Sequence, residues 1–400
     1  MTLTKFVGLL AGGVALTGIA QAENNDALAQ IAELRAEIAS LQSQNSDNWL
    51  TEARASEIRG IVTDVLADAD TRSSFQGSNA TSGYDNGFFI SSADGNFRLN
   101  VGFLGQYMWV IADNDDDLAT VSGFQINDMV VSFSGHVVDS TWTYYTELVN
   151  TAYANYQPLD GSYTGFRQVT MTKDFGNGFS VTGGNFRAPF LRSSLLGDAS
   201  QLGIGYGEVD DTYSAGYRLG ASVNWQNDKF SVTYAFVNDD AGTGTNPGDS
   251  FVRGEYLAAG SWAQFDKDVS FRGESFGLLV GGAYSYNTGT GGADGTSNWT
   301  VDVTAMFGGF SAGVEYVDAD DNGYGLEVFA DYMFSDNMDV FVVWDDFGDG
   351  SASEDENDME VGTNWYFNGT ATRWTNEIAF PVESGDTLNF AFASQLQISF

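Results

Sequence analysis

The chain of 400 residues contains no cysteine, one histidine, four prolines and only 16 lysines and arginines. Without cysteine it cannot form disulfides, thiolate zinc sites or iron–sulfur clusters held by cysteine. Its 54 aspartates and glutamates give a formal net charge of −38, which argues against a nucleic-acid partner because phosphates would be repelled. After the first 22 residues no apolar run approaches the roughly 20 residues that a membrane-spanning helix needs.

Glycine and aromatic residues are abundant. The 48 glycines and an aromatic content of 14% distinguish the sequence from a disordered acidic polymer, which has few aromatics. The chain therefore has enough apolar surface to fold, and its pattern along the sequence decides the fold class.

The first 22 residues have the organisation of a secretory signal peptide. Lys5 precedes an apolar stretch over 6–20, and the small residues Ala20 and Ala22 flank Gln21 before Glu23. The apolar stretch is too short for a membrane anchor. We expect residues 1–22 to be a signal peptide and the mature chain to leave the cytoplasm.

Residues 23–70 show helical periodicity. Apolar residues recur with heptad spacing at Ala27, Ile31, Leu34, Ile38 and Leu41, which predicts a short α-helical coiled coil. A helix of this length is marginal alone, so it either oligomerises or docks; a frayed amphipathic leader is the alternative. Polar residues over 71–95 are expected to form a linker.

From residue 96 to 400 the periodicity changes to two. Leu99, Val101 and Phe103 alternate with Arg98, Asn100 and Gly102, and similar alternation returns as far as Phe400. Sixteen such segments are expected, near 96–112, 122–138, 141–151, 164–175, 178–187, 212–226, 229–238, 251–266, 272–287, 298–307, 309–318, 324–334, 337–345, 358–367, 371–380 and 387–400. Short turns alternate with long loops between them, which is typical of an all-β transmembrane antiparallel β-barrel of about 16 strands.

A soluble β-sandwich is the alternative for any single alternating segment. Three features together favour the barrel. Aromatic residues gather near the strand ends of the apolar face, while the other face is small or polar. A sandwich would pack its apolar faces inward, whereas sixteen strands enclose an aqueous lumen. In lipid, only closure satisfies every backbone group.

Two stretches resemble a known family. The sequence over 83–99 resembles the entry to the first strand of outer-membrane porins related to the phosphate-selective O and P type, and Gly184-Asn-Phe-Arg-Ala-Pro-Phe190 resembles that family's strand before the third loop. The terminal Phe400 is similar to the C-terminal aromatic residue that the outer-membrane assembly machinery reads. The resemblance implies a homotrimer of sixteen-stranded barrels whose third loop folds inward.

The connection over 188–211 is the longest, and its leucines and Phe190 are too apolar to remain in water. We expect it to fold into the lumen, as the resemblance also implies. Its charged residues and the arginine before it would then line the pore constriction: Arg187, Arg192, Asp198 and Glu208.

The alternation also predicts which charges line the lumen wall. Arg98, Arg218, Arg253 and Glu255 should point inward from the first eight strands. Later strands should contribute Asp302, Glu315, Glu327, Asp331, Asp339, Glu360, Arg373 and Glu377. Arginines that face carboxylates would set up a transverse field across the pore. Charges scattered through a wide, wet lumen are the alternative.

Catalytic residues, metal ligands and cofactors are not expected. The single histidine, His136, falls on the lumen face, and the acidic string that begins at Asp318 has Phe329 where a calcium loop needs glutamate. The acidic runs 113–117 and 345–358 are expected to be solvated loop tips, with loose calcium binding as the alternative.

The sequence therefore predicts a porin of the bacterial outer membrane that lets small hydrophilic solutes and ions diffuse, with its N-terminal segment in the periplasm. Residues 96–400 carry 11 basic and 42 acidic residues, a balance of −31 that should favour cations. An anion or phosphate channel with an arginine ladder, a barrel-embedded hydrolase and a surface adhesin are the alternatives. The expected partners are outer-membrane lipid, other copies of the chain and the assembly machinery.

Overall fold

The structure, a computed structural model, divides into two units, 1–78 and 79–400. It describes residues 32–37, 39–40, 56, 60, 63, 80–85, 87–112, 121–151, 163–238, 248–288, 295–320, 323–348, 356–381 and 390–400. The described residues of the first unit are helical and exposed. The expected signal peptide and the seam positions Ile31, Ile38 and Leu41 lie outside the described residues.

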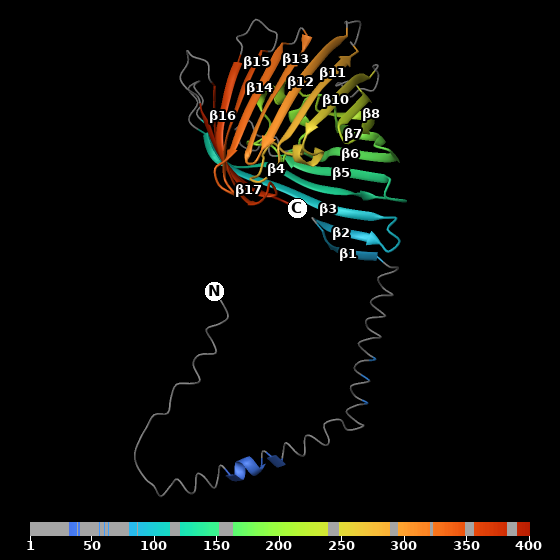
Figure 1. The fold of residues 1–400 in the computed structure, drawn as a ribbon, viewed down its shortest axis with the longest axis vertical. Coiled ribbons are helices and arrows are strands. Elements are labelled where there is room, and N and C mark those ends of the chain that lie inside the picture. The colour runs from blue at the N-terminus through green and yellow to red at the C-terminus, as the bar shows by residue number, and fades with distance from the viewer. Residues whose placement is uncertain are drawn as a thin grey trace, which may run out of the picture. The chain divides into compact units, whose positions relative to one another are not determined.

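Sixteen antiparallel strands form a closed barrel (Figure 1), as the alternation predicts. Their bounds are β3 (Arg98–Ala112), β4 (Val121–His136), β5 (Trp142–Thr151), β6 (Tyr163–Gly176), β7 (Phe179–Arg187), β8 (Tyr217–Gln226), β9 (Phe230–Val237), β10 (Asp249–Ala259), β11 (Gly277–Asn287), β12 (Thr296–Phe307), β13 (Phe310–Asp318), β14 (Tyr324–Met333), β15 (Asp339–Gly348), β16 (Glu356–Asn368), β17 (Thr372–Pro381) and β18 (Ala391–Ser399). Each strand pairs with the next, and β18 pairs with β3 from Ser399↔Leu104 to Ala391↔Ala112. The ring is closed at this last pairing.

A β-hairpin precedes the barrel where the sequence predicts only a linker. The strands β1 (Ala80–Tyr84) and β2 (Phe88–Ser92) pair with each other, and β2 continues along the first residues of β3. These residues of β3 extend beyond the end of β18, so their backbone groups would otherwise lack a partner strand. The segment over 71–95, expected as a linker, thus contains a β-hairpin that the sequence analysis did not predict.

The two faces of the wall differ as the alternation predicts. On β18, Leu396 and Ile398 are 44% and 46% exposed on the outside, whereas Gln395 and Gln397 are fully buried inside. Large apolar side chains recur on the outer face of the other strands, where lipid would cover them. Among the described residues, no helix is long and apolar enough to cross a membrane.

Two connections differ from the predicted strand bounds. The predicted strand 212–226 begins only at Tyr217, because residues before it form the helix α4 (Glu208–Tyr213) and Gly216 adopts a φ of 64°. The predicted strands 251–266 and 272–287 are shortened by a connection over 260–276, which contains η1 (Trp262–Phe265). Gly260 ends β10 with a φ of 87°, a backbone conformation that favours glycine.

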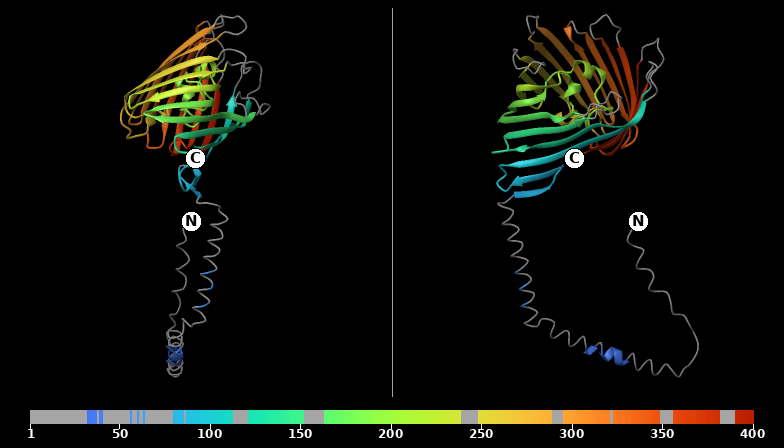
Figure 2. Two further views of the ribbon diagram at one scale, coloured as in Figure 1. Left: turned by 90° about the vertical axis from the view of Figure 1, so that its right-hand side faces the viewer. Right: turned by 180° about the vertical axis from the view of Figure 1, so that it is seen from behind.

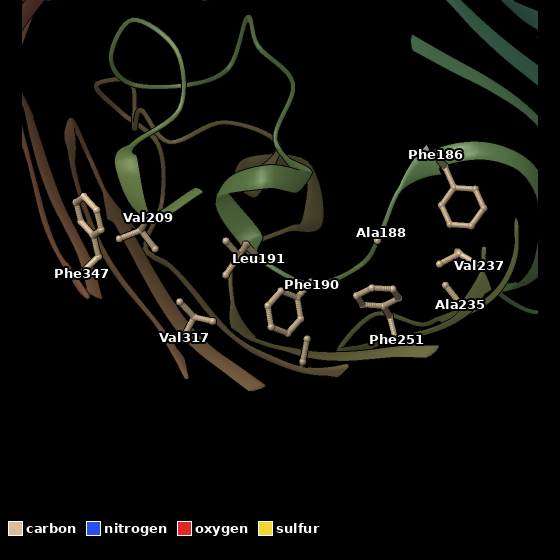
Figure 3. Packing of buried hydrophobic residues seen from close by; sticks show 11 residues of the cluster. Phe186, Ala188, Phe190, Leu191, Val209, Ala235, Val237, Phe251, Val317 and Phe347 are labelled. Atoms are coloured by element: carbon tan, nitrogen blue, oxygen red, sulfur yellow. The ribbon is translucent and has the colours of Figure 1, made fainter. Parts of the chain in front are cut away.

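The barrel is not hollow. The connection over 188–216, which includes α3 (Arg192–Leu195) and α4, lies inside it, as the green segment in Figure 2 shows. Figure 3 shows Phe190 and Leu191 of this connection packed among inward side chains that include Phe251 and Val317. We call residues 188–216 the inner loop.

Candidate functional site: the inner loop and the barrel lumen

The inner loop is held first by apolar burial. Leu191 is 0% exposed and Phe190 2% exposed, and the Phe190 ring lies 6.2 Å from that of Phe251 on β10. Arg253, also on β10, donates to the carbonyl of Phe190 over 2.9 Å. Burial of two large side chains contributes roughly 1.5 to 3 kcal/mol each, so this end of the loop is fixed to the wall.

Inward carboxylates of the later strands accept hydrogen bonds from the loop backbone. Glu315 accepts from the amides of Arg192 and Ser193 at 2.6 and 3.0 Å. Asp345 accepts from the amide of Glu208 at 3.0 Å, and Glu377 accepts from the amide of Ile204 at 2.8 Å. Such charge-assisted bonds are stronger than neutral ones, so the acidic wall anchors the loop.

These carboxylates belong to a continuous row across the sheet. Asp302, Glu315, Glu327 and Asp345 are successive cross-strand partners on β12 to β15. Arg253 reaches one end of the row, where its Nη2 lies 2.8 Å from Asp302. Like charges directly opposite one another on a sheet repel, so the row is costly unless partners bind it. The loop amides supply part of that compensation.

Two glycines let the loop approach the carboxylates closely. A Cβ on Gly207 would lie 2.8 Å from oxygens of both Asp345 and Glu327. A Cβ on Gly203 would lie 2.6 Å from Glu377 and 3.2 Å from Glu360. The loop therefore covers the acidic wall at these points, with no room for a side chain between them.

Arg373 and Asp339 support the same part of the loop. The Arg373 side chain is 1% exposed and donates to the carbonyls of Gln201 and Gly203. Asp339 is 0% exposed and accepts from Tyr366 Oη at 2.6 Å and from the Asn364 amide at 2.8 Å. Both side chains contact other groups of the barrel and the inner loop and do not face the open lumen.

The tip of the loop docks on the opposite wall through Asp198. Its carboxylate lies 2.6 Å from Arg167 Nη2 on β6 and 3.2 Å from Arg187 Nη2 on β7, and Tyr206 donates to it. Burial opposes its ionisation, but Arg167, the hydrogen bond with Asp128 and Arg187 together outweigh burial and lower the pKa of Asp198 below its ordinary value. Asp198 is therefore charged where the loop meets the wall.

Arg167 contacts two further carboxylates, Asp128 at 3.0 Å and Glu147 at 2.9 Å. The sequence alternation did not assign these residues to the lumen, and β-bulges explain why. Asn127 is the extra residue where β4 shifts its pairing register against β3. A second register shift, between β5 and β6, lies at Glu147. A bulge re-aims the side chains beside it, so the period of two fails there.

Arg192 holds the inner loop to the connection over 260–276. Its guanidinium donates to Asp268 at 3.1 Å and to the carbonyl of Phe265 at 3.2 Å, and its side chain is 7% exposed. Burial raises the pKa of Asp268, while Arg192 opposes that shift. The alternation did not predict this contact, because it extended the flanking strands to 266 and from 272 and left Asp268 in a short connection between them.

The remaining expected residues lie in different surroundings. Arg98 contacts the hairpin: it lies 3.5 Å from Asp85 and its Cζ lies 4.3 Å from the Phe89 ring centroid. Arg218 donates to the carbonyl of Ala215. Glu208 is exposed on α4, and Glu255 lies 3.0 Å from Arg253. Asp331 is 1% exposed and lies beside Ser311. The Phe400 ring stacks on Phe103, just after β18.

His136 lies at the end of β4, and its Nε2 is 2.8 Å from the backbone carbonyl of Gly95. In the part of the chain that the structure describes, no group of three or more histidine, aspartate or glutamate side chains is arranged to hold a metal ion.

The buried Asp210 on α4 gives the inner loop a pH dependence. Burial raises the pKa of Asp210 to about 6, although the Ser194 hydroxyl, Arg187 and the Ser193 hydroxyl oppose the shift. The folded form binds this proton more firmly than the unfolded chain does. The stabilisation that protonated Asp210 contributes is therefore full below about pH 4 and is lost as the pH rises to about 6. Asp210→Asn keeps the acceptor oxygen and removes the titration.

We therefore expect Asp210→Asn to match the wild type in unfolding temperature at pH 4 and to exceed it increasingly up to pH 6, with a constant difference above. Thermal unfolding of the detergent-folded protein at several pH values measures this. A difference between the two proteins that does not change with pH would contradict the expectation.

Comparison with solved structures shows that the fold of this chain is similar to that of bacterial porin barrels. No protein-family model matches the chain, and no curated protein matches it in sequence. Among solved structures it is similar to OmpF of Salmonella typhi, solved in complex with daunomycin, with a TM-score of 0.55 and 12% identity over 80% of this chain and 100% of that one.

Two other porin structures show the same likeness. Variants of the Rh. blastica porin match with a TM-score of 0.50 and 13% identity over 76% of this chain and 100% of theirs. The trimer form of OmpT, an outer membrane protein of Vibrio cholerae, matches with a TM-score of 0.51 and 12% identity over 76% of this chain and 99% of that one. The likeness establishes a sixteen-stranded porin fold.

Proposed function

We propose that the protein is a channel of the bacterial outer membrane through which small hydrophilic solutes diffuse, with a preference for cations. The observation that carries the proposal is a closed barrel with an apolar outer belt and a polar interior, narrowed by a loop. Such a wall satisfies every backbone group in lipid and leaves a water-accessible lumen. The porin likeness, which includes a trimer form, supports self-association as a trimer. The periplasmic position proposed for the N-terminal segment rests on the sequence alone.

Cation preference is supported by the charge balance of −31 over residues 96–400 and by the pairing of the lumen arginines. Arg167 and Arg187 both bind Asp198, and Arg192 binds Asp268. An anion or phosphate channel would need guanidinium groups open to the path, so these contacts weigh against that alternative. A hydrolase is disfavoured because His136 contacts a backbone carbonyl.

Reversal potentials in a KCl gradient across a planar bilayer test the proposal. We expect discrete conductance steps and a reversal potential of the sign that favours K⁺, smaller at high salt because charges are screened. Asp198→Asn should lower the preference, since it removes the carboxylate shared by Arg167 and Arg187. Glu327→Gln replaces a carboxyl group of the wall behind the loop, where the loop covers it, and should have a smaller effect.

A reversal potential that favours Cl⁻ would contradict the proposed cation preference and support the anion-channel alternative. A folded barrel that conducts no ions would contradict the channel function and leave the surface adhesin as the remaining alternative.

A further inference from the structure

Two cavities lie on either side of the inner loop. The first, of about 390 Å³, is lined on the barrel side by residues of β5 to β8, including Tyr145, Arg167 and Tyr217. The second, of about 330 Å³, is lined by Trp262 and Phe265 of the connection over 260–276 and by β8, β10 and β11. The segment 195–197 of the inner loop lines both cavities, so a solute that moves between them passes this segment.

Leu195 is an unusual residue for this position. It is 40% exposed, although it belongs to α3 inside the barrel. Large apolar residues on the strands with similar exposure, such as Leu219 on β8, lie on the outer face, where lipid would cover them. Leu195 therefore presents an apolar surface to the water of the lumen at the junction of the two cavities.

Both cavities also have aromatic walls. Tyr206 and Tyr217 line the first cavity, where the Arg187 Cζ lies 4.4 and 4.9 Å from their ring centroids. Trp262 and Phe265 line the second, and the Trp262 indole nitrogen donates to the carbonyl of Asn227. The Arg187 guanidinium already lies over the Tyr206 and Tyr217 rings, so Trp262 of the second cavity offers the aromatic face on which an apolar group or a cation can bind.

The charges that line the first cavity balance one another. Its two arginines, Arg167 and Arg187, are paired with the two lining carboxylates, those of Glu147 and Asp198. The first cavity therefore has no excess charge of either sign.

The second cavity carries a negative excess, which favours a cation there over an anion. Its arginine, Arg192, binds Asp268, whereas Asp266 is exposed and makes no salt bridge within the described residues. The acidic row around Glu327 and Asp345 contributes to neither lining, since the inner loop covers it.

We propose that the two cavities and Leu195 form a binding path for small organic cations that carry an aromatic or other apolar group. This inference rests on the proposed channel function for its transport aspect, but binding itself does not depend on conduction. Leu195 and Trp262 bind the apolar group, and Asp266 of the second cavity binds the cationic group.

Titration calorimetry of the full chain, folded in detergent, tests the binding with benzyltrimethylammonium and, for comparison, tetramethylammonium. We expect the ring-bearing ion to bind more tightly. Leu195→Ser should weaken its binding about four- to fifteenfold, which is the effect of losing one to two buried methylene contacts. Asp266→Asn should weaken the binding of both ions.

Two control variants separate the path from the rest of the barrel. Leu219→Ser makes the same exchange on the outer face, and Asp228→Asn removes a carboxylate from an exposed turn; both should bind like the wild type. Block of K⁺ current by the same ions is then compared in the bilayer, where Leu195→Ser should reduce block by the ring-bearing ion.

Equal affinity for the two ammonium ions, or binding unchanged by Leu195→Ser, overturns this inference while leaving the channel intact. Binding that depends on Leu195 in a barrel without conductance supports the binding path and overturns the channel function.

Discussion

Replacing Val328 with arginine is expected to destabilise the folded barrel by about 2 to 4 kcal/mol. Val328 lies halfway along β14 and is 37% exposed on the outer face. In the proposed membrane location, its side chain reaches the middle of the hydrocarbon layer, where a guanidinium loses its hydration. Urea-induced unfolding in lipid vesicles, followed by tryptophan fluorescence, measures the change.

Tyr332→Arg on the same strand is the matched control. Tyr332 also faces outward, at 53% exposure, but lies near the end of β14, where an arginine reaches the interface and should cost about 0 to 1 kcal/mol. Equal tolerance of the two substitutions would show that the outer face of β14 is not in contact with lipid.

Arg167→Met is expected to cost about 3 to 5 kcal/mol, because it leaves Asp128, Glu147 and Asp198 with a buried negative charge and no shared partner. The tip of the inner loop should then detach from β6. Adding Asp198→Asn to Arg167→Met should recover part of the loss, since one of the three carboxylates is removed.

Arg98→Met provides the comparison for a pair in water. Its partner Asp85 has 70% of its side chain exposed and lies 3.5 Å away, so the loss should stay within about 1 kcal/mol. If Arg167→Met cost no more than Arg98→Met, the docking of the loop tip would not depend on the carboxylate cluster.

The strand pattern was predictable because lipid and lumen impose opposite preferences on alternate residues. On β18, Gln395 and Gln397 point inward and Leu396 and Ile398 point outward, as the alternation predicts. The sequence also suggests that Gln395→Arg would be tolerated in a wet lumen. The structure changes that expectation: Gln395 is fully buried and accepts from Asn127, so a longer charged side chain has no space.

The cluster around Asp198 was only partly predictable. Asp198 and Arg187 belong to the long apolar connection and its flanking strand, and the sequence singled out both. Asp128, Glu147 and Arg167 were missed because register shifts between β3 and β4 and between β5 and β6 break the period of two. A bulge depends on how two strands pair, and that information is not contained in either strand alone.

The sequence by itself determined a barrel of sixteen strands, since a period of two over 300 residues with an apolar face and a polar face can be satisfied in lipid only by a closed antiparallel sheet. It also determined an acidic lumen. Only the tertiary structure decided which acidic residues anchor the inner loop and which charges border the two cavities. Those roles depend on contacts between segments far apart in the chain, such as the amide of Ile204 with Glu377 and Arg192 with Asp268.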